Sequence, residues 1–263
     1  MIIRVLMENS TACDQLACEH GLSLHIEQGG MSLLFDAGQS DAFAANAAKM
    51  GVDLSAVDFA VLSHGHYDHS GGLARFLQLN DHAPVYVHHR AFEPHFNASN
   101  QYIGVDPSLQ GHPRIVTTQD EHALPGGAQL CTCNALVRGC PASARGMSVD
   151  VGGTRIQDSF AHEQYLILEE HGRRVVISGC SHKGILDIVR WLRPDVLIGG
   201  FHFMKLDPQG GDAPLLRAAA KELLASGCTF YTGHCTGEAP FAFLKDIMGD
   251  RLHAIHTGTT IEI

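Results

Sequence analysis

The stretch that decides the fold is Asp58-Phe-Ala-Val-Leu-Ser-His-Gly-His-Tyr-Asp-His-Ser-Gly-Gly72. Its first six residues are mostly apolar and predict a short buried strand. Side chains alternate in an extended chain, so His64 and His66 point the same way and can share one metal ion. The chain then turns toward a predicted helix, which swings Asp68 and His69 to another side, where they can hold a second ion. We therefore predict four metal ligands here, with Asp68 also accepting the proton released in catalysis.

Around this stretch the sequence alternates short apolar runs with helical patterns. A Gln28-Gly-Gly30 turn joins two of the runs as a hairpin. Strands are predicted over 2–7, 22–27, 31–36, 58–63, 84–88, 165–168, 174–178, 195–198 and 229–232, and helices over 40–50, 71–79, 184–192, 213–225 and 239–248. Hairpins early in each half, followed by alternating helices and strands, predict an α/β fold with sheets inside and helices outside. We find no linker, so we expect a single domain over 1–263.

The segment from about 90 to 157 is the exception to this regular pattern. It holds many proline, glycine, histidine and arginine residues and has no clear period. A long irregular segment inside a compact domain is usually functional. We expect an insert here that folds over the metal site as a lid, with Arg138 or Arg145 contacting a carboxylate or phosphate of the substrate. A guanidinium suits either group because its donors are forked and its charge is permanent.

Composition excludes several classes of function. Of 263 residues, 45% are hydrophobic, and 18 basic against 28 acidic residues give a net charge of −10. This balance argues against a nucleic-acid partner and against an anionic membrane surface. No apolar run approaches the roughly 18 residues of a membrane-spanning helix, and the start lacks the features of a signal peptide. We expect a cytoplasmic protein with a small anionic molecule as its partner; the sequence does not determine the oligomeric state.

The eight cysteines point to the same reducing compartment. They form no CxxC pair, so free thiols are expected rather than a disulfide framework. Cys131 and Cys133 flank one residue, which in a strand would place both on one face, as small half-buried side chains. Of all the cysteines, Cys180 and Cys235 alone lie in stretches with a chemical pattern.

The His-x-His-x-Asp-His stretch resembles the signature of the metallo-β-lactamase superfamily, and the resemblance extends over nearly the whole chain. Residues 35–41 look like the superfamily's first motif, and residues 178–185, 199–202 and 232–237 are similar to one subgroup. That subgroup includes 7,8-dihydropterin-6-methyl-4-(β-D-ribofuranosyl)aminobenzene-5′-phosphate synthase and many metal-dependent hydrolases. The resemblance implies an αββα sandwich with two central mixed sheets and a two-metal site at one sheet edge.

The resemblance also implies further ligands. His234, after the strand at 229–232, fits the superfamily's last histidine ligand. Two residues are candidates for the third histidine ligand of the first metal ion. The general superfamily pattern points to His162, and the subgroup motif points to His182, which we prefer. Cys180 is either a thiolate ligand in place of the usual carboxylate or a small buried side chain. A thiolate would favour zinc, with iron or manganese as alternatives.

Two other residues have supporting roles in this reading. Asp36 ends its strand and is expected to hydrogen-bond ligands or loop amides rather than a metal. His202, after the strand at 195–198, is expected beside the ligands or the substrate. Neither residue is predicted to bind a metal ion directly.

Two zinc ions per chain, about 3.5–4 Å apart, would activate a water molecule as hydroxide. The predicted function is therefore a metal-dependent hydrolase acting on an anionic ester, phosphoester or lactone. The alternative is a non-hydrolytic synthase or transferase that uses the same metal site on a phosphoribosyl-type substrate. A diiron redox protein is disfavoured because Cys180 stands where such proteins need a bridging carboxylate.

Overall fold

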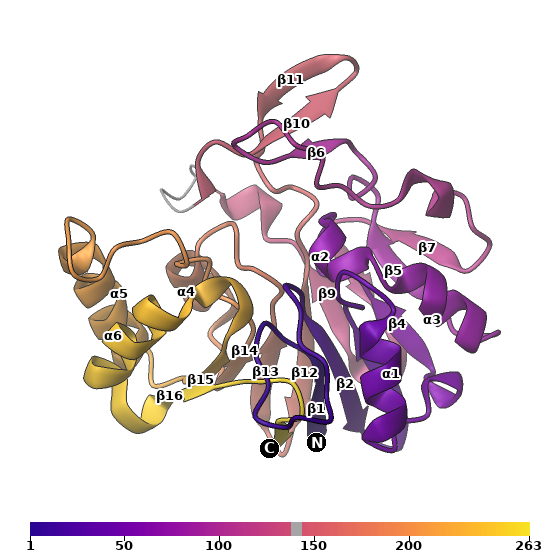
Figure 1. Ribbon diagram of the computed structural model, residues 1–263, viewed down its shortest axis with the longest axis horizontal. Coiled ribbons are helices and arrows are strands. Elements are labelled where there is room, and N and C mark those ends of the chain that lie inside the picture. Colours follow the sequence, from indigo (N-terminus) through magenta and orange to yellow (C-terminus); the bar gives the residue numbers. More distant parts are fainter. Residues whose placement is uncertain (138–143) are drawn as a thin grey trace.

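Two seven-stranded sheets pack face to face, and helices cover the outer face of each (Figure 1). The computed structural model of the protein describes residues 1–137 and 144–263. This is the mixed α/β, αββα architecture that the sequence predicted. The two chain ends lie side by side at the base of the sandwich, where the amino group of Met1 donates to the carbonyl oxygen of Ile263 at 3.2 Å.

The first sheet is mixed and has the order β17-β1-β2-β3-β4-β5-β7. Its strands β1 to β3 pair antiparallel, and β3, β4, β5 and β7 run parallel. The bounds are β1 Ile2–Met7, β2 Ser23–Gln28, β3 Met31–Phe35, β4 Phe59–Val61, β5 Val85–His88, β7 Ile115–Thr118 and β17 Thr260–Glu262. Helices α1 (Ala42–Lys49) and α3 (Leu73–Leu79) pack on its outer face through Phe43 and Phe76.

The second sheet is also mixed and has the order β16-β15-β14-β13-β12-β9-β8. Its bounds are β8 Glu121–Ala123, β9 Gln129–Cys131, β12 Tyr165–Glu170, β13 Arg173–Ile177, β14 Val196–Ile198, β15 Thr229–Thr232 and β16 Leu252–Ala254. Its outer face is covered by α4 (Ile185–Leu192), α5 (Ala213–Ala225) and α6 (Glu238–Met248). The parallel strands β13 to β16 therefore end at one edge.

Burial on both faces explains why the central strands are apolar throughout. In β13, Val175 and Ile177 pack into the core between the sheets, and Val176 packs against the outer helices. The sequence of a strand that is covered on both sides is a continuous apolar run. This is the pattern that the sequence showed.

Three further strands form a separate small sheet with the order β11-β10-β6. Strand β6 is His95–Phe96, β10 is Ser148–Val151 and β11 is Thr154–Gln157. Figure 1 shows this sheet above the sandwich, at the edge where the parallel strands end. Among the described residues, no helix is both long and apolar enough to cross a membrane.

The segment from 90 to 157 is more regular than the sequence suggested. Six strands lie in its described residues: β7, β8 and β9 extend the two large sheets, and the other three form the small sheet. These strands are two to four residues long, and several of their side chains are exposed. Such short, half-solvated strands carry too few apolar positions to produce a recognisable period.

Candidate metal centre

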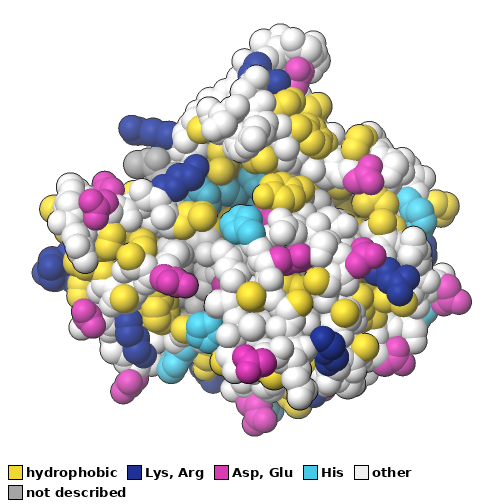
Figure 2. All heavy atoms as spheres, in the orientation of Figure 1, with side chains coloured by type: hydrophobic (Ala, Val, Ile, Leu, Met, Phe, Trp, Pro, Cys, Tyr) yellow, Lys and Arg dark blue, Asp and Glu magenta, His cyan; other side chains and the backbone are white. Residues whose placement is uncertain are grey.

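The candidate site lies where neighbouring strands of both sheets end. His64 follows β4, Cys180 and His182 follow β13, and His234 follows β15. Within each sheet these strands run parallel, so their carboxyl ends meet at one edge. The short helix α2 (Tyr67–Ser70) then turns the chain immediately after His66. On the face seen in Figure 2, histidine side chains gather below the small sheet.

The first group of candidate ligands contains His64, His66 and His182, all buried. The Nε2 atoms of His64 and His182 lie 3.3 Å apart, and the ring centres of His66 and His182 lie 4.8 Å apart. The buried Nε2 of His66 and Nδ1 of His182 have no hydrogen-bond partner among the described residues. Buried polar atoms are rarely left unpaired, so this group fits a metal ion.

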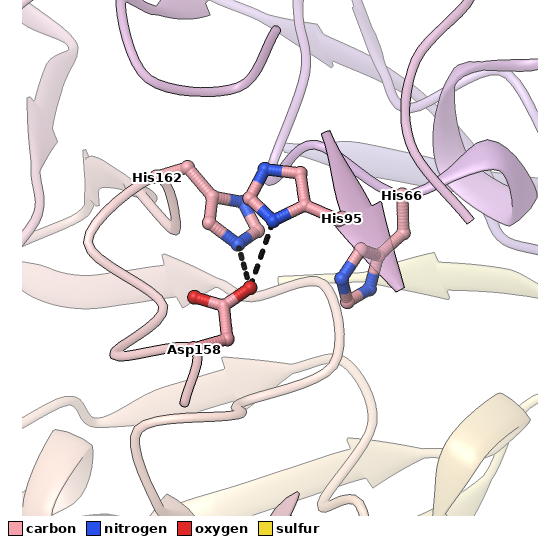
Figure 3. A group of neighbouring side chains, drawn as sticks. All are labelled: His66, His95, Asp158 and His162. Atoms are coloured by element: carbon pink, nitrogen blue, oxygen red, sulfur yellow. Dashed lines mark hydrogen bonds and ion pairs between the residues drawn. The ribbon is translucent and has the colours of Figure 1, made fainter. Parts of the chain in front are cut away.

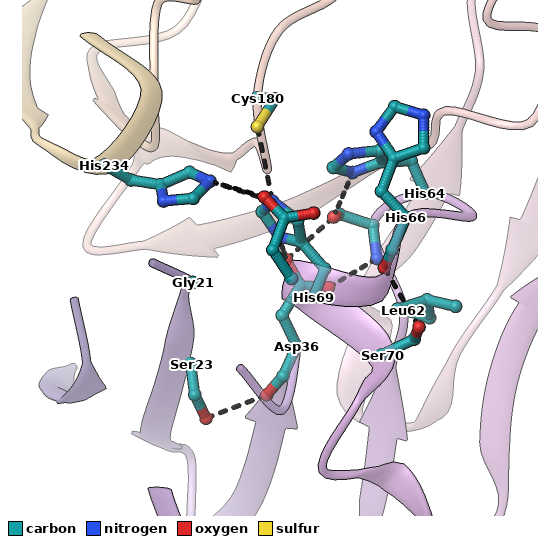
Figure 4. A network of polar contacts seen from close by, with 12 residues as sticks. Gly21, Ser23, Asp36, Leu62, His64, His66, His69, Ser70, Cys180 and His234 are labelled. Atoms are coloured by element: carbon teal, nitrogen blue, oxygen red, sulfur yellow. Dashed lines mark hydrogen bonds and ion pairs between the residues drawn. The ribbon is translucent and has the colours of Figure 1, made fainter. Parts of the chain in front are cut away.

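The second group contains Asp68, His69, Cys180 and His234, also buried. Figure 4 shows that His69, Cys180 and His234 point toward one another. The Nε2 atom of His69 lies 3.2 Å from the Cys180 Sγ and 3.2 Å from the His234 Nε2, and Asp68 Oδ2 lies 3.2 Å from the same His234 atom. One carboxylate, one sulfur and two imidazoles make a donor set that suits zinc.

The two groups are direct neighbours. The rings of His64, in the first group, and His69, in the second, have centres 4.2 Å apart. The two groups of candidate ligands therefore form one continuous cluster.

Asp36 orients one histidine in each group. Its Oδ2 accepts hydrogen bonds from His69 Nδ1 at 2.6 Å and from the Ser63 hydroxyl at 2.7 Å (Figure 4). Because the Ser63 hydroxyl donates to Asp36, its oxygen accepts the hydrogen of His64 Nδ1, 2.8 Å away. Both rings thus carry their hydrogen on Nδ1 and turn Nε2 toward the metal side.

His234 is oriented by Asn9, for which the sequence gave no signal. The Nδ1 atom of His234 lies 2.8 Å from Asn9 Oδ1, an oxygen that can only accept, so Nε2 is left for a ligand. The backbone N–H of His234 donates to the buried carboxylate of Glu8. His20 lies at the outer side of this group, with its Nε2 3.3 Å from Asp68 Oδ2 and its side chain 39% exposed. No motif marks His20, Asn9 or Glu8 in the sequence.

The loop that carries His182 is held by Glu163. The Glu163 carboxylate accepts from the backbone N–H groups of His182 at 2.7 Å and Lys183 at 3.1 Å. Lys183 is buried and donates to the carbonyl oxygens of Thr132 and Glu163, so its ammonium group supports the loop and does not face a substrate. Burial lowers the pKa of Lys183 to about 8.

The electrostatics of the site favour neutral imidazoles, which bind metals. Burial, reinforced by neighbouring histidines, places the pKa values of His64, His66 and His182 well below the usual 6.5. Burial alone would also lower the pKa of His69. The carboxylates of Asp36 and Asp68 outweigh this effect of burial and raise the pKa. Burial raises the pKa of the Cys180 thiol well above its usual value, so its thiolate needs a metal ion as partner.

His162 lies beside these groups but bonds differently (Figure 3). Its Nδ1 accepts the backbone N–H of Gly65 at 2.8 Å. Since that amide can only donate, the ring carries its hydrogen on Nε2, which faces Asp158 Oδ2 at 3.4 Å. Asp158 also accepts from His95 Nδ1 at 2.8 Å. Both nitrogens of His162 are therefore engaged, which favours His182 as the third imidazole.

The ligand atoms of His66, His95, Asp158 and His162 lie within 4.8 Å of one another, so distance alone would permit another ion there. The protonated Nε2 of His162 removes one of the four ligands. In this group the side chains of His95, Asp158 and His162 are joined by hydrogen bonds. These bonds connect His95 on β6 of the small sheet to the loop that carries His64 and His66. Neither His95 nor Asp158 belongs to a motif in the sequence.

The remaining predicted residues lie as follows. His202 is buried with its ring centre 4.3 Å from that of His182. Arg145 is exposed, just before β10 of the small sheet. Arg138 lies outside the described residues, so its predicted contact with substrate stays a prediction, as does that of Arg145.

Two mixed sheets between helices, with paired metal-ligand groups at one edge, define the metallo-β-lactamase class of proteins. The family model described as the metallo-beta-lactamase superfamily matches residues 18–131. The crystal structure of Tm1679, described as a metal-dependent hydrolase of the beta-lactamase superfamily, superimposes with a TM-score of 0.85 at 28% identity, covering 100% of this chain and 99% of that one. The chain is therefore similar to the metallo-β-lactamase superfamily, in the sequence of residues 18–131 and in its whole fold.

Two curated relatives come from Methanocaldococcus jannaschii. One is 7,8-dihydropterin-6-methyl-4-(beta-D-ribofuranosyl)-aminobenzene-5'-phosphate synthase, which is 26% identical over 90% of this chain and 88% of its own length. The other is the uncharacterized protein MJ0448, which is 28% identical over 77% of this chain and 80% of its own length. The subgroup resemblance seen in the sequence is thus matched by a relative with that activity in its name.

Proposed function

We propose that the protein is a metal-dependent hydrolase that holds two zinc ions and cleaves an anionic ester, phosphoester or lactone. The observation that carries the proposal is the convergence of His69, Cys180 and His234 around one point, next to the unpaired ring nitrogens of His66 and His182. The fold of Tm1679 adds support, since that protein is described as a metal-dependent hydrolase.

In this proposal the first ion is held by His64, His66 and His182, and the second by Asp68, His69, Cys180 and His234. Divalent ions at these places would supply Lewis-acid chemistry and lower the pKa of a water molecule toward about 7. Asp68 is suited to accept the proton of that water. Its pKa, which burial alone would raise, is held well below the usual value by His69, His20 and His234, so it is ionised.

The surroundings restrict the space above the ions. His95 on β6 lies with its ring centre 5.7 Å from that of His66, so the small sheet covers the first group directly. A substrate would enter from the side of Asp68, where the side chain of His20 is 39% exposed. An anionic group on the substrate would offset the charge of the two ions, and Arg145 is an exposed cation on the small-sheet side.

The experiment that tests this function is a substrate panel with the metal-loaded protein. Phosphodiesters, lactones and phosphoribosyl compounds are incubated with the protein under identical conditions. The products are then separated, and their masses are measured by mass spectrometry. Hydrolysis adds the elements of water to the substrate. We expect turnover of at least one anionic ester class that disappears in His66→Ala. Turnover that survives in His66→Ala would assign the activity to a contaminant.

A synthase is the second candidate, and the specific observation for it is the 26% identity to the M. jannaschii synthase over 90% of the chain. The same panel separates the two functions. If the phosphoribosyl substrate joins a second substrate and no ester is hydrolysed, the site catalyses bond formation and the hydrolase proposal is wrong.

A further inference from the structure

A pair of thiols lies outside the candidate metal centre, at the end of β9. Cys131 is the last residue of this strand, and Cys133 follows in a left-handed conformation with φ 57°. This turn brings the Cys133 Sγ to 3.5 Å from the Cys131 Sγ. The sequence suggested two half-buried side chains on one strand face. The structure instead places the second cysteine beyond the strand and directs its sulfur at the first.

One of the two cysteines lines an open surface and the other is buried. Cys131 lines an open hollow of about 490 Å³, together with His122, Ile167 and Arg174. Cys133 is 8% exposed and packs into the core under the outer helices. A small molecule in the hollow can therefore reach Cys131 first, with Cys133 directly behind it.

The two thiols also differ in acidity in the direction that an exchange reaction needs. A hydrogen bond from Cys133 lowers the pKa of Cys131 to about 7. The same hydrogen bond, together with burial, raises the pKa of Cys133. The accessible thiol is thus the one that ionises near neutral pH, and the thiolate is the form that attacks a disulfide.

The pair is not part of a metal site among the described residues. A structural zinc site needs about four ligands, and no described histidine, cysteine, aspartate or glutamate joins these two sulfurs in a candidate metal group. Two thiols without further ligands suit covalent pairing.

We propose that Cys131 and Cys133 are a redox-active dithiol that a small-molecule disulfide, such as oxidised glutathione, converts to an intramolecular disulfide. The Cys131 thiolate attacks one sulfur of oxidised glutathione, breaks its S–S bond and releases one glutathione thiolate. Cys133 then loses its proton to solvent and attacks the Cys131 sulfur, which releases the second glutathione. The protein loses two hydrogens, and one glutathione disulfide becomes two thiols. The sulfurs need to approach from 3.5 Å to about 2.0 Å.

The test uses the full-length, metal-loaded protein and oxidised glutathione. After exposure, free thiols are alkylated and the protein is digested with trypsin. Residues 115–138 form one tryptic peptide that contains both Cys131 and Cys133 and no other cysteine. We expect this peptide to lose two hydrogens, to resist alkylation, and to regain two alkylatable thiols after treatment with dithiothreitol.

Two single variants test the order of attack. In Cys133→Ser, the reaction should stop at a mixed disulfide of glutathione with Cys131. In Cys131→Ser, the buried Cys133 should stay unmodified under the same conditions. The exposed Cys13 and Cys18, which lie together in the tryptic peptide 5–49, report whether the reagent was active.

The proposal is wrong if the peptide 115–138 keeps two free thiols while Cys13 or Cys18 carries glutathione. It is also wrong if the unmodified sequence accumulates the mixed disulfide at Cys131 without closing to the intramolecular disulfide, because the 3.5 Å separation would then have no chemical consequence.

Discussion

The Nδ1 atom of His162 lies 2.8 Å from the backbone nitrogen of Gly65, inside the loop that carries His64 and His66. A backbone amide can only donate, so this contact uses the lone pair that would otherwise bind a metal ion and fixes the ring hydrogen on Nε2. Burial lowers the pKa of His162 to about 4, so the ring is neutral at physiological pH. His162 therefore positions the loop of His64 and His66, and we expect His182 to be the imidazole available to the first ion.

The first prediction compares these two histidines. His182→Asn should lower metal affinity about tenfold or more, because it removes a ligand. His162→Asn should change the affinity little, since the asparagine side-chain oxygen can accept the Gly65 amide hydrogen in place of Nδ1. Affinity is measured by competition with a coloured chelator. The reverse ranking would make His162 the ligand and assign His182 another role.

The second prediction concerns Asp36, which orients His69 directly and His64 through Ser63. Asp36→Asn keeps the size of the side chain but removes the charge that holds both rings. We expect metal affinity to fall about 10- to 100-fold, the range typical of residues that orient metal ligands. Asp58→Asn is the matched control, because Asp58 accepts the Ser32 amide far from the metal-ligand groups. Equal affinities in the two variants would rule out this role of Asp36.

The third prediction is the pH dependence of folding without metal. The folded-state pKa values of His64, His66 and His182 lie well below 6.5, whereas in the unfolded chain they return to about 6.5. Below about pH 6.5 the unfolded chain therefore binds more protons, and the free energy of unfolding should fall as the pH decreases. His69, whose pKa is raised, has the opposite effect on the free energy of unfolding. It is a single group, however, whereas the three histidines named above have lowered pKa values.

Urea denaturation of the metal-free protein at pH 5.5 and 7.5 measures this effect. We expect the lower midpoint at pH 5.5. The carboxylates of Asp68 and Asp158, whose pKa values are lowered, contribute only below about pH 4 and do not affect this comparison. A midpoint that is unchanged or higher at pH 5.5 would mean that the histidines are not buried as neutral rings.

The fourth prediction concerns Arg145 at the base of the small sheet. Arg145→Ala should raise KM for an anionic substrate severalfold and leave metal content and kcat nearly unchanged, because the guanidinium binds the substrate and not the ions. Arg75→Ala, which removes a half-buried arginine on α3, is the control. An unchanged KM in Arg145→Ala, and in the corresponding variant of Arg138, would exclude the predicted role of these arginines.

The sequence predicted the elements whose pattern is dictated by burial. The strands β1, β3, β13 and β15 and the helix α5 appear close to the predicted bounds, because central strands and amphipathic helices leave strong apolar periods. The four predicted ligands in the stretch from His64 to His69 were recognisable because two groups of candidate metal ligands begin in one short stretch.

The residues that position the ligands could not be found in the same way. Asn9, Asp158 and Glu163 act through hydrogen bonds to residues 225, 63 and 19 positions away in the chain, respectively. No local spacing rule connects such partners, since only the folded sheets bring them together. The role of His162 was open for the same reason, because its tautomer depends on the Gly65 amide 97 positions earlier.

The most direct test of the account is the metal content of the purified protein after reconstitution with zinc and removal of excess ion. Elemental analysis should give two zinc ions per chain in the parent, one in His182→Ala and one in Cys180→Ala, because each substitution removes a ligand from a different group. The parent and both variants are compared at equal folded concentration, verified by circular dichroism. No bound metal in the parent, or two ions retained in both variants, would contradict the two ligand groups on which the proposed function rests.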